Sequence, residues 1–287
     1  MTLPREVCVL GLGLMGGSIG LSLRERHPGI RTSGWSRRPE TRAQASAARV
    51  VRRVAESPAD AVRGADLVIL CGPVRSLPEM ARECRDALEP GALVTDVGST
   101  KEWLMHEMPE ALAGSGAVFA GSHPMCGSEQ QGLSSARPGL YHDAFVAVTA
   151  HPGPAEQAAA GRIEEFWRAL GARPVRMDAR IHDTRVAAIS HLPHVAAALV
   201  IEAALRGEDP GRDAMIAGGF RDTTRVASGP ADVWIDILRT NRGPVDDMLA
   251  AMESGLIEVR RMLAAEDWTS LQSWLDECRK ARGRILP

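Results

Sequence analysis

The chain has 287 residues, of which 45% are hydrophobic and 24% charged, so it can bury a sizeable core and disorder is excluded. Its 34 basic and 36 acidic side chains leave a formal charge of −2, which offers no basic field for nucleic acid or an anionic membrane. No apolar run approaches the roughly 18 residues of a membrane span and no signal-peptide pattern opens the chain, so we expect a cytoplasmic protein that binds a small molecule.

The five cysteines are odd in number and form no C-x-x-C pair. We therefore expect neither a disulfide framework nor a zinc knuckle. Lysine is rare, since only Lys101 and Lys280 occur among the 34 basic residues. A lysine that persists in so Arg-rich a chain is a candidate for a chemical role.

Short apolar runs alternate with helical periodicity up to about residue 178. Strands are predicted at 7–10, 31–35, 66–71, 92–96, 118–120, 145–149 and 173–177. Helices are predicted at 18–26, 101–113 and 155–170. This alternation predicts an α/β fold with a parallel, doubly wound sheet.

Strand character ends near Asp178, and only helical periodicity follows. Helices are predicted at 182–206, 209–218, 230–239, 243–264 and 267–282, separated by glycine and Gly-Pro breaks. We therefore expect two domains, an α/β domain over 1–177 and an all-helical domain over 178–287.

A glycine loop connects the first strand to the first helix. In Gly11-x-Gly13-x-x-Gly16 the first glycine allows a tight turn, the second lets a pyrophosphate approach the backbone, and the third lets helix pack on strand. Alone the motif is weak, but its place between a strand and a helix at the head of a β/α series predicts a dinucleotide site. The residues expected to contact the dinucleotide are Gly11, Gly13, Leu14, Met15, Gly16, Gly72 and Pro73.

The end of the second predicted strand bears on the choice between NADP and NAD. An NAD-binding protein usually carries an acid there, whereas this chain has Ser36, Arg37 and Arg38. A hydroxyl and two guanidinium groups suit a 2′-phosphate, so we predict NADP, with NAD as the alternative. The competing interpretation is that both arginines belong to a solvated turn.

Three polar clusters follow the glycine loop, where the topology directs them to the crevice beyond the strand ends. The first is DVGSTK at 96–101 and the second is GSHPMCGSE at 121–129. The third spans the helical part and comprises His182-Asp183, SHLPH at 190–194, GFRDTTR at 219–225 and Trp234.

Together with GLGLMGGS, these clusters resemble the prephenate/arogenate dehydrogenase family of tyrosine biosynthesis. The resemblance covers nearly the whole chain and rests on the combination of motifs. It implies an N-terminal Rossmann-type domain and a C-terminal all-helical domain that forms a homodimer and completes the active site. It also implies an enzyme that transfers a hydride to nicotinamide.

The resemblance assigns catalytic roles to two residues. His123 matches the catalytic histidine, and an imidazole with an ordinary pKa near 6.5 is a natural acceptor for a hydroxyl proton, so activity should rise with pH as that imidazole loses its proton. Ser99 matches a serine that hydrogen-bonds near the substrate hydroxyl. The structural alternatives are a capping or core histidine and an N-cap serine for the helix beginning near Lys101.

The remaining site residues are expected to bind substrate. Arg225 matches an arginine that clamps a carboxylate, Asp222 and Glu129 could position it, and His194 matches a residue that binds the substrate side chain. His191 is expected to be structural, with Pro193 kinking the helix. Trp234 is expected to form an apolar wall, or simply to pack. Lys101 is assigned to the substrate site without a defined role.

A metal site at His191 and His194 is the competing interpretation of that pair. No nearby carboxylate completes a ligand set, so we predict no metal.

The implied reaction is oxidative decarboxylation of prephenate to 4-hydroxyphenylpyruvate. Arogenate, with an amino group in place of the side-chain keto group, and 4-amino-4-deoxyprephenate are the alternatives; His194 and Glu129 favour prephenate. A β-hydroxyacid dehydrogenase shares the glycine loop but would carry a catalytic lysine in the helical domain, where no lysine is suitably placed. A non-catalytic dinucleotide sensor would not need Ser99, His123, His194 and Arg225 together.

Overall fold

The computed structural model describes residues 3–126, 130–207 and 211–285. The chain divides into two compact units, Met1–Arg242 and Gly243–Pro287. A parallel sheet of order β3-β2-β1-β4-β5-β6 forms the centre of the first unit. Its strands are β1 (Glu6–Leu10), β2 (Arg31–Trp35), β3 (Arg53–Val54), β4 (Leu67–Leu70), β5 (Leu93–Asp96) and β6 (Val118–Phe119). The strand order reverses between β1 and β4, where doubly wound sheets bind ligands.

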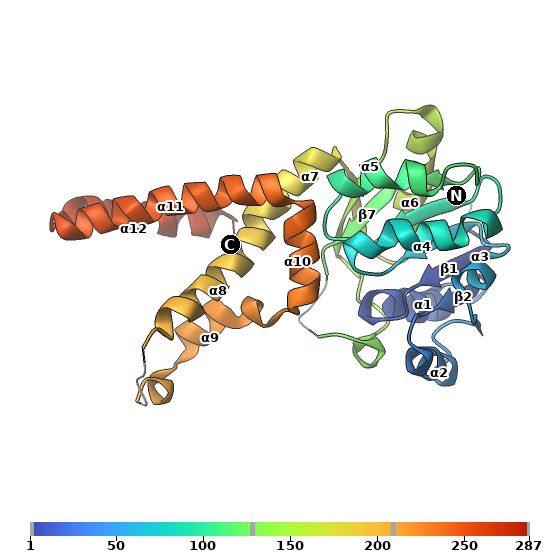
Figure 1. Cartoon of the computed structure of the whole chain (residues 1–287), viewed down its shortest axis with the longest axis horizontal. Helices are drawn as coiled ribbons and strands as arrows, with labels where there is room; N and C mark the ends of the chain where they lie inside the picture. The colour runs from blue at the N-terminus through green and yellow to red at the C-terminus, as the bar shows by residue number, and fades with distance from the viewer. Residues whose placement is uncertain (1–2, 127–129, 208–210, 286–287) are drawn as a thin grey trace. The chain divides into compact units, whose positions relative to one another are not determined.

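Helices cover both faces of this sheet, so the predicted α/β fold is confirmed (Figure 1). One apolar core packs α1 (Leu14–Arg26), α2 (Pro39–Ala47) and α6 (Pro154–Ala169) against the strands. The other packs α3 (Pro58–Val62), α4 (Leu77–Cys84) and α5 (Glu102–Ala111) on the opposite face. The central strands β1, β4 and β5 are buried on both faces, which explains the apolar runs of β1 and β4.

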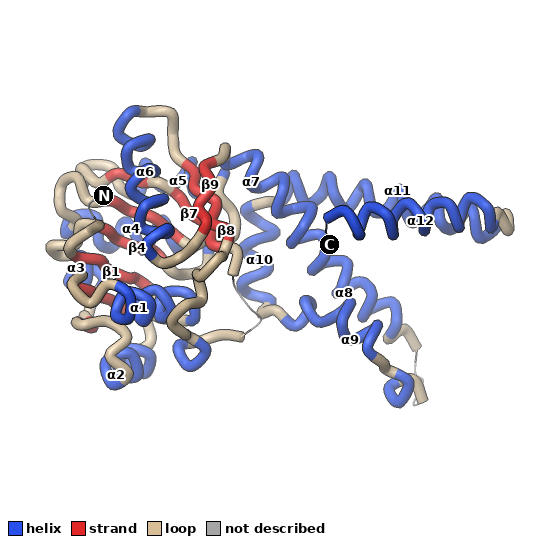
Figure 2. The backbone as a smooth tube through the Cα atoms, turned by 180° about the vertical axis from the view of Figure 1, so that it is seen from behind, coloured by secondary structure: helices blue, strands red, loops and turns tan. Residues whose placement is uncertain are grey.

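Three further strands form a second sheet that is not part of the six-stranded ladder (Figure 2). It contains β7 (Gly121–Pro124), antiparallel to β8 (Phe145–Thr149), and β9 (Arg173–Arg176), parallel to β8. The predicted strands at 145–149 and 173–177 therefore exist, but they do not extend the parallel sheet. Strand β7 was not predicted, because Gly-Ser-His-Pro lacks the apolar run that signals a strand.

Helices follow Asp178 in the first unit. They are α7 (Ala179–Val186), a π-helical turn (Ala187–His191), α8 (Leu192–Ala204), α9 (Gly218–Thr224) and α10 (Ala231–Thr240). The irregularity precedes Pro193, whose missing N–H and bulky ring disturb the preceding turn. The helix predicted at 209–218 is wrong over the described part of that range, which holds the short 3₁₀ turn Asp213–Met215.

From the sequence we expect no apolar run as long as a membrane span, but the continuous helical stretch Ala179–Ala204 is an exception to that expectation. It is long and apolar enough to cross a membrane by length and composition. This is weak evidence, because a site-lining helix of a globular protein passes the same test, and this stretch carries buried His182 and Asp183.

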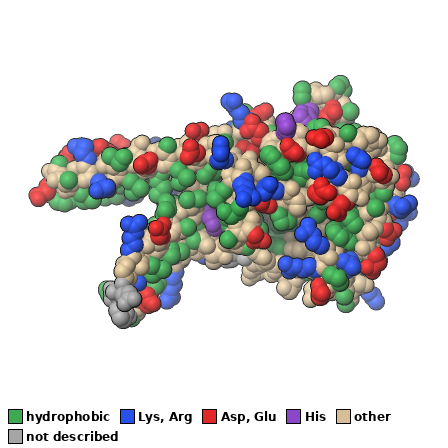
Figure 3. Space-filling view, viewed as in Figure 1, with side chains coloured by type: hydrophobic (Ala, Val, Ile, Leu, Met, Phe, Trp, Pro, Cys, Tyr) green, Lys and Arg blue, Asp and Glu red, His purple; other side chains and the backbone are tan. Residues whose placement is uncertain are grey.

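The second unit consists of the helix pair formed by α11 (Arg242–Ala264), from its second residue onward, and α12 (Trp268–Ile285). The two helices run side by side in both views (Figures 1 and 2). Large apolar side chains remain exposed along the pair, as the space-filling view shows (Figure 3). These side chains are Leu256, Ile257, Leu263, Trp268, Trp274, Leu275 and Ile285.

Candidate active site

A cavity of about 710 Å³ opens at the carboxyl ends of β1, β4 and β5. It lies at the crevice that the strand order predicts for a ligand. Its lining comes from the glycine loop, the ends of β4 and β5, strand β7, the π-helical turn and the α9–α10 region. The cavity therefore combines elements from both predicted domains within the first compact unit.

The glycine loop fits a pyrophosphate. Gly11 has a positive φ of 104°, and a Cβ there would overlap the carbonyl of Cys71, while a Cβ on Gly16 would overlap the carbonyl of Gly11. Gly13 has open space where its Cβ would be, so a ligand can approach the backbone. Helix α1 begins directly after Gly13 with no side-chain cap, which leaves its N-terminal N–H groups available to an anion.

Other predicted dinucleotide contacts also line the cavity, namely Leu14, Met15, Gly72 and Pro73. Ser36, Arg37 and Arg38 do not line it. The Gly11 N–H donates to the carbonyl of Trp35 at 2.8 Å, which places the end of β2 beside the glycine loop. The Arg42 guanidinium holds the following turn by donating to two backbone carbonyls there. The side chains of Arg37 and Arg38 are exposed.

His123 belongs to a chain of three polar side chains. Its Nδ1 lies 2.9 Å from Nε2 of His182, and Nδ1 of His182 lies 2.7 Å from Oδ1 of Asp183. The Asp183 carboxylate also accepts hydrogen bonds from the backbone N–H groups of Lys101 and Glu102, at 2.8 and 2.9 Å. These N–H groups begin α5, so the helix dipole stabilises the ionised carboxylate.

The hydrogen bonds determine the tautomer of His123. An ionised Asp183 can only accept, so the Nδ1 of His182 carries the proton and its Nε2 has a lone pair. That lone pair must accept a hydrogen bond, so Nδ1 of His123 donates. The Nε2 of His123 is consequently a proton acceptor on a residue that lines the cavity. This is the form required of a general base.

From the sequence we expect an ordinary imidazole pKa for His123, but the structure shifts this pKa. Burial lowers this pKa well below 6.5, and the positive charge of Lys101 lowers it further. The imidazole is therefore neutral at physiological pH. The expected rise of activity with loss of its proton moves to lower pH.

Lys101 is not at the cavity surface, contrary to the expectation of substrate contact. Its side chain is fully buried, where Nζ pairs with Asp96 and donates to the carbonyl of Ser122 at 2.9 Å. Burial lowers the pKa of Lys101, while Asp96 opposes that shift. The Asp96 carboxylate also accepts from the backbone N–H groups of Gly98 and Ser122. The pair thus links β5 to β7 and positions the segments that carry the two predicted catalytic residues.

Ser99 lines the cavity in the turn between β5 and α5. It is not the N-cap of α5, because that helix begins after Lys101 and its first N–H groups are held by Asp183. Ser99 and His123 thus line the same cavity.

The helical residues separate into two groups. Arg225 and Trp234 line the cavity, as does His191, which was expected to be structural. His194 does not line it: its ring stacks on Trp234 with a centroid distance of 3.5 Å. Asp222 is exposed on α9 outside the lining. Glu129 lies outside the described residues.

Sequence reasoning gave no role to His182 or Asp183, although it singled out the pair. The available signal was the adjacent His-Asp pair itself, which lies four and five positions after Asp178, the N-cap of α7. No group of three or more His, Cys, Asp or Glu side chains within the described ranges is arranged to hold a metal.

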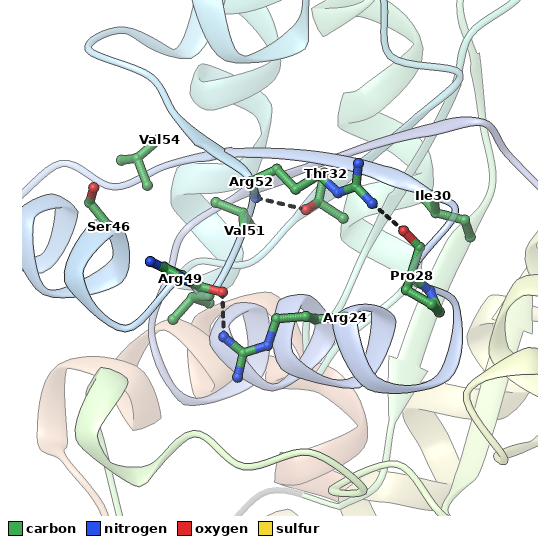
Figure 4. Close-up of a pocket in the computed structure, with 10 residues that line it drawn as sticks. Arg24, Pro28, Ile30, Thr32, Ser46, Arg49, Val51, Arg52 and Val54 are labelled. Carbon is green, nitrogen blue, oxygen red and sulfur yellow. Dashed lines mark hydrogen bonds between the residues drawn. The ribbon is translucent and has the colours of Figure 1, made fainter.

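A second cavity, of about 390 Å³, lies at the amino-terminal ends of β2 and β3 (Figure 4). Hydrogen bonds between neighbouring segments surround this cavity. The Arg24 guanidinium donates to the carbonyls of Ala48 and Arg49, and the backbone N–H of Arg52 donates to the hydroxyl of Thr32. These hydrogen bonds join α1 and β2 to the loop before β3, which is a structural role.

Comparison with known proteins identifies the family. The prephenate dehydrogenase nucleotide-binding domain matches residues 19–176, and the prephenate dehydrogenase dimerization domain matches residues 178–277. The chain is 32% identical to the cyclohexadienyl dehydrogenase of Zymomonas mobilis (98% of this chain, 96% of the relative) and 33% identical to the prephenate dehydrogenase of Bacillus subtilis (92% and 72%). A crystal structure of the Aquifex aeolicus prephenate dehydrogenase with hydroxyphenyl propionate and NAD+ has a TM-score of 0.90, with 27% identity and 99% of both chains covered. The chain therefore belongs to the prephenate dehydrogenase family of oxidoreductases.

Proposed function

We propose that this enzyme catalyses oxidative decarboxylation of prephenate to 4-hydroxyphenylpyruvate in tyrosine biosynthesis. The observation that carries the proposal is His123, whose Nε2 lone pair is fixed by His182 and Asp183 on a cavity that begins at a dinucleotide-type glycine loop. Residues 1–177 would bind the dinucleotide, and 178–287 would complete the substrate site. We place the reaction in the cytoplasm.

The chemistry uses the residues on the cavity surface. The Nε2 of His123 takes the proton of the ring C4 hydroxyl, and Ser99 hydrogen-bonds the same oxygen. The glycine loop would hold a dinucleotide, which would supply the acceptor for the hydride that leaves C4. As the C4 carbonyl forms, the C1 carboxylate departs as CO2 and the ring becomes aromatic, which provides the driving force. Arg225 clamps a substrate carboxylate and Trp234 provides an apolar wall.

We propose NADP as the preferred cofactor, with NAD as the alternative. The support is the pair of exposed arginines, Arg37 and Arg38, directly after a strand whose last carbonyl is hydrogen-bonded to Gly11. A 2′-phosphate on a ribose at that strand end would lie within reach of guanidinium groups.

We propose that the protein is a homodimer. The match to a dimerization domain and the exposed apolar side chains of α11 and α12 support this assembly. Burial of those side chains against a second copy would remove an apolar surface that is costly to leave in water.

The decisive experiment is a steady-state assay of the purified enzyme that crosses prephenate and arogenate with NADP and NAD. The proposal requires prephenate with NADP to have the highest kcat/KM. If the enzyme turns over neither substrate, the proposed function is refuted. If it prefers arogenate, arogenate replaces prephenate as the assigned substrate.

A further inference from the structure

His191 has a hydrogen-bonding arrangement opposite to that of His123. Its ring is 1% exposed and lines the cavity. The side-chain amide nitrogen of Asn241 lies 2.8 Å from the backbone carbonyl oxygen of Asp183 and 3.0 Å from Nδ1 of His191. The ring also packs edge-on against Trp234, with a centroid distance of 6.0 Å.

These contacts fix the tautomer of His191. A carbonyl oxygen can only accept, so the Asn241 atom facing it is the nitrogen, and that nitrogen donates to both partners. The Nδ1 of His191 is therefore an acceptor, and the ring proton is on Nε2. Burial lowers the pKa of His191 to about 4, so the ring stays neutral. The remaining polar group of this ring is the Nε2–H, which can donate a hydrogen bond to a ligand in the cavity.

His194, the residue expected to contact the substrate side chain, is differently placed. It stacks flat on Trp234, with an interplanar angle of 12°, and forms a hydrogen bond with the backbone of Val226. One helical turn therefore separates a histidine that lines the cavity from one that supports its wall.

We propose that His191, held by Asn241, donates its Nε2–H to the keto oxygen of the substrate side chain and thereby selects the α-keto acid over its α-amino counterpart. This inference rests on the proposed function and names the group that would set its substrate preference. A keto oxygen has the lone pairs that the N–H donor needs, whereas an ammonium group offers only donors. An ammonium group at this position would leave two donors facing each other out of water, which is costly.

The test compares two variants with prephenate and with arogenate. His191→Leu removes the donor and should lower kcat/KM for prephenate roughly ten- to a hundredfold, mainly through KM, while arogenate changes by less than about threefold. The ratio of the two kcat/KM values should therefore fall toward one. His191→Gln keeps a side-chain N–H donor and should recover most of that ratio.

Damage to the fold would lower kcat/KM alike for both substrates. The ratio of the two kcat/KM values therefore distinguishes such damage from the proposed role of His191. An equal loss with both substrates, or a His191→Gln variant as unselective as His191→Leu, would overturn the role of His191 while leaving the proposed function intact. Failure of the wild-type enzyme to turn over either substrate would instead refute the function on which the inference rests.

Discussion

His123 and His182 share a hydrogen bond of 2.9 Å between Nδ1 and Nε2, although 59 positions separate them in the chain. One histidine lies on β7 of the second sheet and the other on α7. The rings meet edge-on, with an interplanar angle of 77°. The first helix after the predicted domain boundary thus determines the tautomer of a histidine in the α/β part.

His182→Phe should lower kcat because His123 would lose the acceptor that keeps its Nε2 free of a proton. We expect a loss of roughly 10- to 1000-fold, since the removal of an orienting partner can cost as much as the loss of a general base. Dinucleotide affinity, measured by fluorescence titration, should stay within about twofold. The matched control is His106→Phe, which replaces an exposed histidine on α5. A His182→Phe enzyme with normal kcat would show that the hydrogen bond has no part in catalysis.

The pH profile of kcat/KM should be flat between about pH 6 and 8. Burial lowers the pKa of His123 well below 6.5, so the base is already unprotonated through this range and loses activity only at lower pH. His123→Asn should keep dinucleotide binding and reduce kcat by about 10²–10⁴. A limb centred near pH 6.5 in the wild-type profile would contradict the lowered pKa.

Arg225→Lys should raise the substrate KM while dinucleotide affinity stays unchanged. Lysine keeps the charge but loses the two-pronged geometry that a carboxylate prefers. Initial-rate kinetics over a range of substrate concentrations measure the effect. If KM is unaffected, a different cation, such as Arg221, holds the carboxylate.

Arg37→Ala should reduce kcat/KM with NADP by roughly ten- to a hundredfold, because one or two charge-assisted hydrogen bonds to the 2′-phosphate would be lost. Activity with NAD should change little, since NAD lacks the phosphate. Ser36→Asp should invert the preference by repelling the phosphate and accepting from a ribose hydroxyl. If the wild-type enzyme prefers NAD and Arg37→Ala changes kcat/KM with neither cofactor, both arginines are surface residues without a role in cofactor binding.

Lys101→Met should lower the free energy of unfolding by roughly 3–5 kcal/mol, because it leaves the Asp96 carboxylate buried without its counter-ion. Denaturant titration measures this loss. The double variant Lys101→Met/Asp96→Asn removes the uncompensated charge and should be more stable than Lys101→Met. Equal stability of the two variants would show that the buried charge is not the cause.

Local sequence patterns predicted seven of the nine described strands and missed β3 and β7. The strands at 31–35 and 145–149 have the predicted bounds, and the glycine loop lies between β1 and α1 as expected. Apolar periodicity and glycine spacing carry this information because each depends on neighbours within one element. Strand β7 was not predicted, because its four residues extend through pairing with β8, which lies more than 20 positions away.

The residue types of the candidate site could also be read from the sequence, through motifs that contain Ser99, His123 and Arg225. Their environment could not. Only the tertiary structure buries Lys101 against Asp96, brings His182 to His123, and places His191 rather than His194 on the cavity. The arrangement of the histidines depends on hydrogen bonds between distant segments, since His123 and His182 are 59 positions apart and Asn241 and Asp183 are 58 positions apart. The sequence by itself determined which chemical groups are available, whereas packing determined their tautomers and burial, because desolvation and hydrogen-bond direction are properties of the assembled surroundings.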